Sequence, residues 1–176
     1  GRGLMSATQV ICALCGSFLT VVDSKWSIWP CGSNRMTNQK SICICGSMAF
    51  IDEMESMAAS LRIAGYAVAT PISEESSSNW DSLSEDESFA LKRNYIDAHL
   101  AKIKQSDLVL LANYPKNGIG GYIGANSLME AAFAYALGIP VAYLEQIGEQ
   151  PCRLEALSIS QAIVGEDISA IDSLFE

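Results

Sequence analysis

Residues 106–144 read SDLVLLANYPKNGIGGYIGANSLMEAAFAYALGIPVAYL. The unbroken apolar run Leu108–Ala112 predicts a strand that is covered on both of its faces. A glycine-rich loop, Tyr114–Ala125, leads into a helix predicted from about Ser127 to Leu137, and Val141–Leu144 predicts the next strand. This order of strand, helix and strand indicates a unit with two parallel strands.

The same alternation extends toward the N-terminus. Ile42–Cys45 predicts a short buried strand, Asp52–Ala64 a helix with apolar residues every three or four positions, and Tyr66–Ile72 a second strand. The motif Ser84-x-x-Glu87 predicts a capping box, and hence the start of a helix that runs to about residue 105. We expect the inner face of that helix to carry four apolar residues: Phe89, Ile96, Leu100 and Ile103.

Downstream of residue 144 the sequence offers two helical pieces, Arg153–Leu157 and Ile168–Phe175, around a short strand near Ile163. Strands that alternate with helices are typical of a doubly wound parallel sheet, an α/β Rossmann-like architecture. We therefore expect a single domain of this class over residues 38–176. In such a sheet the ligand binds beyond the carboxyl ends of the strands, so the loops that follow the strands form the candidate site.

The chain is acidic, because its 176 residues include 20 Asp and Glu but 11 Lys and Arg, for a net charge of −9. Binding to nucleic acid or to an anionic membrane surface requires clustered cations, and the sequence shows no such cluster. Both are therefore excluded as partners, whereas a single nucleoside or nucleotide is not. The apolar run Val10–Val22 is too short to cross a bilayer, which takes about 20 residues.

Residues 1–37 differ from the rest of the chain and predict an N-terminal extension of the domain. They lack helical periodicity and are rich in Gly, Ser, Cys and Trp. Such an extension is an added or wrongly assigned segment, a flexible tail, or a tail that covers the domain. The alternative is a signal peptide with Val10–Val22 as its apolar region, although Arg2 is the only positive charge before it.

Six cysteines bear on the compartment and on metal binding. Their uneven spacing does not resemble the disulfide framework of a small secreted domain, so we expect a protein of the reducing cytoplasm. Cys43 and Cys45 lie in an alternating apolar run and are expected to be small buried hydrophobic residues. Cys12 and Cys15 have the spacing of a zinc or redox motif, and Cys31 could add a third ligand. A structural zinc needs four ligands, so no metal site is predicted.

Two loops on the ligand side of the predicted sheet differ in character. Gly46-Ser47-Met48 ends the first strand, where a glycine lets a ligand approach the backbone amides beside a hydroxyl. This loop lacks the G-x-G-x-x-G pattern and the P-loop lysine, which disfavours a dinucleotide or a triphosphate and leaves a phosphate or a ribose. Residues 73–88 are acidic and serine-rich, and are long enough for a mobile lid; a solvated loop is the alternative.

A third loop has four glycines within residues 118–124 and enters an apolar helix that carries Glu130. The motif Ser127-x-x-Glu130 fits a capping box, which needs no ligand. A carboxylate in the first turn of such a helix is also suited to attack an electrophilic sugar carbon. This segment offers further groups for a base or a sugar: Tyr122, Gly124 and Asn126.

The helix that precedes the strand at residues 108–112 carries several titratable residues. His99 suits proton transfer and Asp97 stands two positions earlier, although each residue type is also common on surfaces. Asp107 is expected to anchor the start of the strand. Lys92 and Arg93 are candidates for binding a phosphate, or else belong to a solvated helix face.

The ordered set of these motifs resembles the nucleoside 2-deoxyribosyltransferase superfamily, which includes the 2'-deoxynucleoside 5'-phosphate N-hydrolases. The set comprises Cys-Gly-Ser at residues 45–47, the run IKQSDLVLL at residues 103–111, and G-x5-E-x3-A-x3-G-x-P at residues 124–140. The resemblance covers roughly residues 40–146.

The resemblance implies a flavodoxin-like fold and cleavage of an N-glycosidic bond without a metal or an organic cofactor. It implies that Glu130 attacks C1' of the sugar, and that water or a second base resolves the glycosyl ester. An Asp of the family falls at the position of His99. Either Asp97 reaches the site, or His99 takes the proton-transfer role, or the activity differs or is lost. Members of the family are often homo-oligomers in which a neighbour completes the pocket.

The sequence thus predicts an enzyme that cleaves a nucleoside, a deoxynucleoside or the 5'-monophosphate of either, by hydrolysis or by transfer. One alternative is a module of the same fold that binds a nucleotide without turnover. Another is a phosphoribohydrolase of the lysine-decarboxylase-like group. Its motif Pro-Gly-Gly-x-Gly-Thr-x-x-Glu is echoed with different spacing by Gly120–Gly124 and Glu130.

Overall fold

The computed structural model describes residues 8–11, 18–22, 25–26, 39–165 and 168–175. The chain divides into two compact units, Gly1–Asn38 and Gln39–Glu176. None of the helices in the described part of the chain is long and apolar enough to cross a membrane.

The first unit contains an antiparallel sheet in the order β1-β2-β3. Its strands are β1 (Thr8–Ile11), β2 (Phe18–Val22) and β3 (Lys25–Trp26). The apolar run Val10–Val22 therefore supplies the end of one strand and the whole of the next. The three cysteines considered as metal ligands in this unit lie outside the described residues: Cys12, Cys15 and Cys31.

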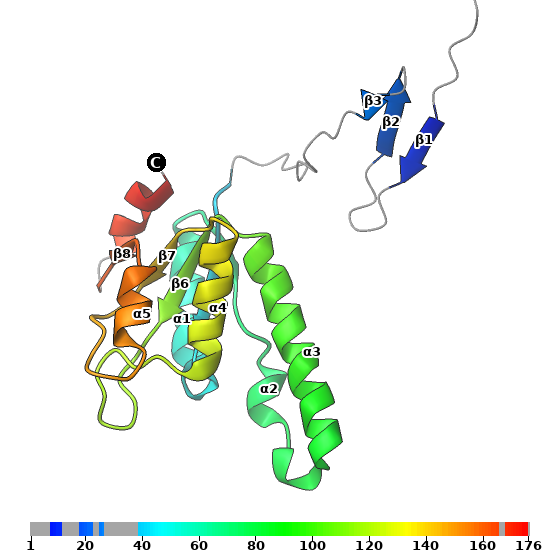
Figure 1. Cartoon of the computed structure of the whole chain (residues 1–176). Helices are drawn as coiled ribbons and strands as arrows, with labels where there is room; N and C mark the ends of the chain where they lie inside the picture. Colours follow the sequence, from blue (N-terminus) through cyan, green and yellow to red (C-terminus); the bar gives the residue numbers. More distant parts are fainter. Residues whose placement is uncertain (1–7, 12–17, 23–24, 27–38, 166–167, 176) are drawn as a thin grey trace, which may run out of the picture. The chain divides into compact units, whose positions relative to one another are not determined.

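The second unit is built on a parallel sheet in the order β5-β4-β6-β7-β8 (Figure 1). Its strands are β4 (Ser41–Gly46), β5 (Ala67–Ala69), β6 (Leu108–Ala112), β7 (Val141–Tyr143) and β8 (Ala162–Ile163). Counted along the chain this is the order 2-1-3-4-5 of flavodoxin-like sheets, and every described pair in it is parallel. The predicted doubly wound α/β fold is confirmed.

Helices cover both faces of this sheet. The α-helices are α1 (Ile51–Ile63), α2 (Glu74–Ser77), α3 (Glu85–Lys104), α4 (Ala125–Ala136) and α5 (Arg153–Ser158). The 3-10 helices are η1 (Met48–Phe50), η2 (Trp80–Ser82) and η3 (Ile168–Phe175). In Figure 1, α3 and α4 lie on one side of the sheet and α1 on the other.

The central strand β4 divides its side chains between the two faces, because successive residues of a strand point in opposite directions. Ile42 and Ile44 are buried in the core on the side of α1 and η3, together with Met54 and Leu61. Cys43 and Cys45 are fully buried on the side of α3, α4 and α5. Strand periodicity thus places both thiols beneath the same group of helices.

Three details of the second unit differ from the expectations. The strand expected at residues 66–72 is limited to Ala67–Ala69, and the loop at residues 73–88 holds α2 and η2. Phe89 was expected on the inner face of its helix but is 61% exposed, whereas Ile103 is fully buried. The first turns of α3 extend past the ends of the strands in Figure 1, so no sheet lies there to cover Phe89.

Asp107 anchors the first residues of the two central strands, as expected. Its Oδ2 accepts hydrogen bonds from the backbone N–H of Ser41 at 2.8 Å and from the Ser41 hydroxyl at 2.9 Å. The predicted capping box at Ser84 and Glu87 is also present at the start of α3. The first contact joins residues 66 positions apart and the second is local to one helix, and both hold the ends of elements on which the site depends.

We expect Asp107→Ala to lower the free energy of unfolding by about 1.5–3 kcal/mol, the range for hydrogen bonds to a charged group. The measurement is urea unfolding at pH 7. Asp97→Ala, which removes an exposed carboxylate from α3, is the matched control and should change stability by less than about 0.5 kcal/mol. Equal losses in the two variants would mean that the Asp107–Ser41 contact does not stabilise the sheet.

Candidate active site

A small cavity lies at the carboxyl ends of the central strands, next to the first turns of α4. Its volume of about 20 Å³ is enough for one water molecule. The lining comes from β4, α2, α3, α4 and the loops between them: Gly46, Met48, Pro71, Ile72, Glu75, Lys92, Tyr95, Ile96, His99, Asn126 and Glu130. The cavity therefore lies where a doubly wound fold binds its ligand.

Glu130 projects into this cavity from the second turn of α4. The helix begins two residues earlier than expected, with Gly124 as its N-cap and no side-chain capping bond, so the alternative interpretation of Ser127 and Glu130 as a capping box is wrong. Ser127 is buried instead. The Glu130 side chain is 14% exposed, and its Oε2 has no hydrogen-bond partner among the described residues. A buried oxygen without a partner is costly, so this carboxylate is free to engage a ligand.

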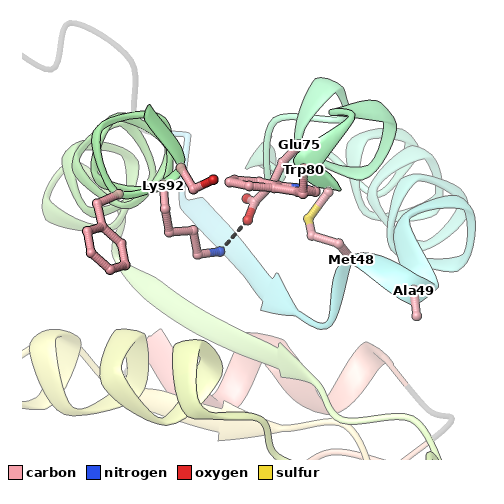
Figure 2. Close-up of a pocket in the computed structure, with 7 residues that line it drawn as sticks. Met48, Ala49, Glu75, Trp80 and Lys92 are labelled. Carbon is pink, nitrogen blue, oxygen red and sulfur yellow. Dashed lines mark hydrogen bonds and ion pairs between the residues drawn. The ribbon is translucent and has the colours of Figure 1, made fainter. Parts of the chain in front are cut away.

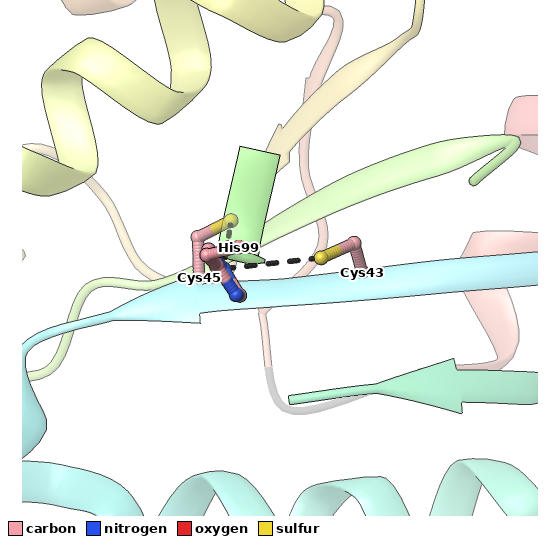
Figure 3. Close-up of side chains that lie close together, drawn as sticks. All are labelled: Cys43, Cys45 and His99. Atoms are coloured by element: carbon pink, nitrogen blue, oxygen red, sulfur yellow. Dashed lines mark hydrogen bonds between the residues drawn. The ribbon is translucent and has the colours of Figure 1, made fainter. Parts of the chain in front are cut away.

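His99 faces Glu130 from α3 and contacts both thiols of β4 (Figure 3). Its Nε2 lies 3.3 Å from the sulfur of Cys45 and 3.9 Å from that of Cys43. The same nitrogen is 3.9 Å from Oε1 of Glu130. His99 is 5% exposed, and its Nδ1 has no partner in the described part of the chain. Sequence reasoning identified His99 and Glu130 separately, but it did not identify the cysteines as their neighbours.

Burial and mutual proximity shift the pKa values of these groups. Burial raises the pKa of Glu130 to about 7, although the charge of His99 acts in the opposite direction. Burial alone would lower the pKa of His99, but the hydrogen bond and charge of Cys43 and the charge of Glu130 raise it overall. The Cys45 and His99 hydrogen bonds lower the pKa of Cys43, while burial raises the pKa of Cys45 far above its usual value.

Asp97 does not belong to this site. Residues two positions apart on an α-helix point about 200° apart, so Asp97 faces away when His99 faces the sheet. Asp97 is exposed and does not line the cavity. Of the two residues considered for proton transfer, the structure brings only His99 to Glu130.

The six residues predicted to bind substrate divide into two groups. Gly46, Met48 and Asn126 line the cavity. Ser47, Tyr122 and Gly124 do not line it. Lys116 contacts both Ser47 and Tyr122. The ammonium of Lys116 donates a hydrogen bond to the Ser47 hydroxyl at 2.8 Å and lies 5.8 Å from the centre of the Tyr122 ring. Lys116 was not singled out from the sequence, because no motif surrounds it.

The glycine-rich loop packs against protein. Gly121 has a φ of +57°, and a Cβ at this position would lie 2.0 Å from the carbonyl oxygen of Gln146. The side chain of Gln150 accepts a bond from the N–H of Ile123 and donates one to the carbonyl of Gly121, both at 2.9 Å. Gly121 allows close packing of the loop onto residues 145–150, so this glycine needs no ligand to explain it.

A larger pocket of about 640 Å³ adjoins the small cavity (Figure 2). Its lining includes residues of η1, α2, η2 and α3: Met48, Ala49, Glu75, Trp80, Ser88, Phe89 and Lys92. Met48, Glu75 and Lys92 line both spaces and form the boundary between them. Figure 2 shows that Lys92 of α3 and Glu75 of α2, two of these shared residues, form an ion pair. Lys92 was a candidate for binding phosphate, but here it forms an ion pair, and Arg93 is exposed.

We expect the stability difference between Glu130→Gln and the wild type to depend on pH. The pKa of Glu130 is about 7 in the folded protein, compared with 4.5 for a glutamate exposed to water, as in the unfolded chain. The penalty for burying its charge is therefore absent below pH 4.5 and complete above pH 7. The variant should gain stability relative to the wild type across this window, by an amount on the order of 3 kcal/mol.

Urea unfolding at pH 4.5 and at pH 8 measures this change. Glu149→Gln, at a carboxylate whose side chain is 93% exposed, is the control and should show no comparable change. A pH-independent difference between Glu130→Gln and the wild type would contradict the raised pKa.

Comparisons with known proteins identify the fold. No protein-family model matches the chain, and no curated protein matches it. Among solved structures, a 2-deoxyribosyltransferase from Bacillus psychrosaccharolyticus is similar at a TM-score of 0.53 and 21% identity, over 75% of this chain and 90% of that one. A CMP N-glycosidase from Clostridium botulinum gives a TM-score of 0.43 and 15% identity, over 77% of this chain and 98% of that one. The second unit therefore has the fold of the Bacillus 2-deoxyribosyltransferase, as its sequence motifs led us to expect.

Proposed function

We propose that this protein is an enzyme that cleaves the N-glycosidic bond of a nucleoside or deoxynucleoside, or of its 5'-monophosphate, with Glu130 as nucleophile. The observation that carries the proposal is the largely buried Glu130 carboxylate, which lines a cavity at the carboxyl edge of the sheet and has one oxygen without a hydrogen-bond partner in the described part of the chain. The fold shared with a 2-deoxyribosyltransferase and the sequence motifs support it.

In the proposed reaction, the Glu130 carboxylate attacks C1' of the sugar while the bond from C1' to the base nitrogen breaks. The base leaves with a proton, which we assign to His99 because it is a titratable side chain beside Glu130 in the cavity lining. Water, or a second base, then attacks C1' of the glycosyl ester and restores the carboxylate. These steps need no metal ion or organic cofactor.

The larger pocket is suited to the base. Its volume of about 640 Å³ falls within the range of small-molecule sites, and the ring of Trp80 offers a flat apolar surface. The reacting sugar carbon has to approach Glu130 through the boundary formed by Met48, Glu75 and Lys92. The proposal therefore requires this boundary to open when substrate binds, by separation of the Glu75–Lys92 ion pair.

The same boundary favours a second candidate function, the binding of a nucleotide without turnover. A ligand held in the larger pocket while Glu75 and Lys92 stay paired would not reach Glu130. In that case a nucleotide would raise the melting temperature, but no free base would form. The presence or absence of free base distinguishes the two functions.

We expect Glu130→Gln to lower the release of free base by at least about 10³-fold, because the amide cannot form the glycosyl ester. The measurement is chromatography of products from a panel of nucleosides, deoxynucleosides and their 5'-monophosphates. Glu149→Gln should retain the wild-type rate. Full activity in Glu130→Gln would exclude the nucleophile.

The same assay tests the proton-transfer residue. His99→Gln should slow base release by about 10²- to 10⁴-fold, the range for general acid–base catalysis. Asp97→Asn, two positions away on the exposed face of α3, should leave the rate unchanged. Equal rates in the two variants would exclude His99 from this role.

A homo-oligomer and a reducing cytoplasm also remain proposals. Tyr135 of α4 is a large apolar side chain that is 60% exposed, and it offers a point of contact for a second copy of the chain. Cys43, Cys45 and Cys152 are free thiols, which suits a reducing compartment.

We expect Tyr135→Glu to dissociate the oligomer by placing a charge in a buried apolar contact. Light scattering coupled to size-exclusion chromatography measures the mass. Ile63→Glu alters an 89% exposed apolar residue on α1 and should leave the mass unchanged. A monomeric wild type at micromolar concentration would contradict this proposal.

A further inference from the structure

Four ligand-type side chains from three elements meet between the sheet and the helices α3 and α4. They are Cys43 and Cys45 of β4, His99 of α3 and Glu130 of α4. The two sulfurs and a ring nitrogen of His99 all lie within 4.8 Å of one another (Figure 3). Neither the proposed glycosidase reaction nor the packing of small apolar residues requires two thiols at this place.

The distances fit a tetrahedral ion. Zinc binds sulfur at about 2.3 Å and nitrogen or oxygen at about 2.0–2.1 Å, so tetrahedral geometry sets sulfur and nitrogen about 3.5 Å apart and nitrogen and oxygen about 3.3 Å apart. Here His99 Nε2 lies 3.3 and 3.9 Å from the two sulfurs, and 3.9 Å from Oε1 of Glu130. The ligand atoms of Cys43, Cys45 and His99 thus lie close to three corners of a tetrahedron. Glu130 is not within 4.8 Å of all three atoms, so its side chain has to move toward the sulfurs to take the fourth position.

The charges of the cluster also favour a cation. Two buried thiols lie near a carboxylate that is 14% exposed. Lys102 of α3 is close enough for its charge to lower the pKa of Cys43, but it is not one of the clustered ligand residues. The negative forms of the thiols and the carboxylate repel one another, and accordingly the charges of Glu130 and Cys43 help to raise the pKa of Cys45. A divalent cation would remove this conflict, because it stabilises both thiolates and the carboxylate as the thiol protons pass to solvent.

We propose that Cys43, Cys45 and His99 bind one thiophilic divalent cation, of which Zn²⁺ is the best fit. The carboxylate of Glu130 supplies the fourth ligand. An ion held this way withdraws Glu130 from attack on a sugar, so the site inhibits the enzyme. The inhibition rests on the proposed function, but ion binding does not.

An ion can reach the cluster through the small cavity, since His99 and Glu130 both line it. The space of about 20 Å³ holds one water molecule or one ion. Entry passes Met48, Glu75 and Lys92, the same boundary that a substrate must open. Metal and substrate therefore compete for one carboxylate by one route.

The test is titration of the reduced, chelator-treated full chain with Co²⁺ and then with Zn²⁺. We expect one Co²⁺ per chain, with the near-ultraviolet charge-transfer absorption of cobalt thiolate bonds, and loss of that absorption when Zn²⁺ displaces cobalt. Cys45→Ser and His99→Gln should each weaken binding by at least about 10- to 100-fold. Absence of the absorption in the wild type would overturn the proposal.

Two controls assign the ion to this cluster. Cys152→Ser removes a half-buried free thiol outside the cluster and should leave binding unchanged. Cys12→Ser/Cys15→Ser removes the other candidate pair and should also leave it unchanged. If binding survives in Cys45→Ser and His99→Gln but is lost in Cys12→Ser/Cys15→Ser, the assignment is wrong. Circular dichroism shows which variants are folded.

Inhibition of base release by the bound ion is measured in a separate experiment. Zn²⁺ at one equivalent should abolish base release by the wild type, and a chelator should restore it. An active enzyme that binds Zn²⁺ without loss of rate would refute the inhibition. If no substrate in the panel releases base, the proposed function fails, while the cobalt titration still decides the metal site.

Discussion

The organisation of this protein depends on one constraint, the covering of β4 on both faces. β4 pairs in parallel with β5 and β6, so it lies inside the sheet, and its alternating side chains have to satisfy two cores at once. Ile42 and Ile44 fill one core, whereas Cys43 and Cys45 face the helices that carry His99 and Glu130. Small thiols at these two positions leave room for a histidine and a carboxylate, where larger aliphatic side chains would fill the space.

Burial of His99 and Glu130 is a cost that the rest of the fold must offset. The apolar strand β6, fully buried along its five residues, and the small residues Ala131 and Ala134 of α4 hold the helix against the sheet. Asp107 holds the far ends of the central strands in register through Ser41. The carboxyl edge then carries groups with shifted pKa values, which are common at functional sites.

Much of the fold could be predicted from the sequence, because the apolar runs and the capping box at Ser84 are local signals. The start of α4 could not, since Ser127 and Glu130 imitate a capping box while the helix actually begins after Gly124. Glu130 was recognised from its setting and from the resemblance. The choice between Asp97 and His99 depended on the direction in which α3 faces the sheet. The contacts of Cys43, Cys45 and Lys116 depend on pairing between distant elements, which no local pattern reveals.

The ion pair between Glu75 and Lys92 connects the two proposals. The pair lies between the larger pocket and the small cavity that contains Glu130. It also joins the short helix α2, which the sequence did not indicate, to the long helix α3. A substrate that opens this pair exposes Glu130 to a sugar carbon, whereas an ion that enters when the pair opens binds the same carboxylate together with the two thiols. Because one carboxylate cannot serve as a nucleophile and as a metal ligand at once, the geometry that makes Glu130 reactive also makes it sensitive to metal. A substitution of Cys45 distinguishes the metal-binding role from the catalytic role, because this residue is a proposed metal ligand but does not line the cavity.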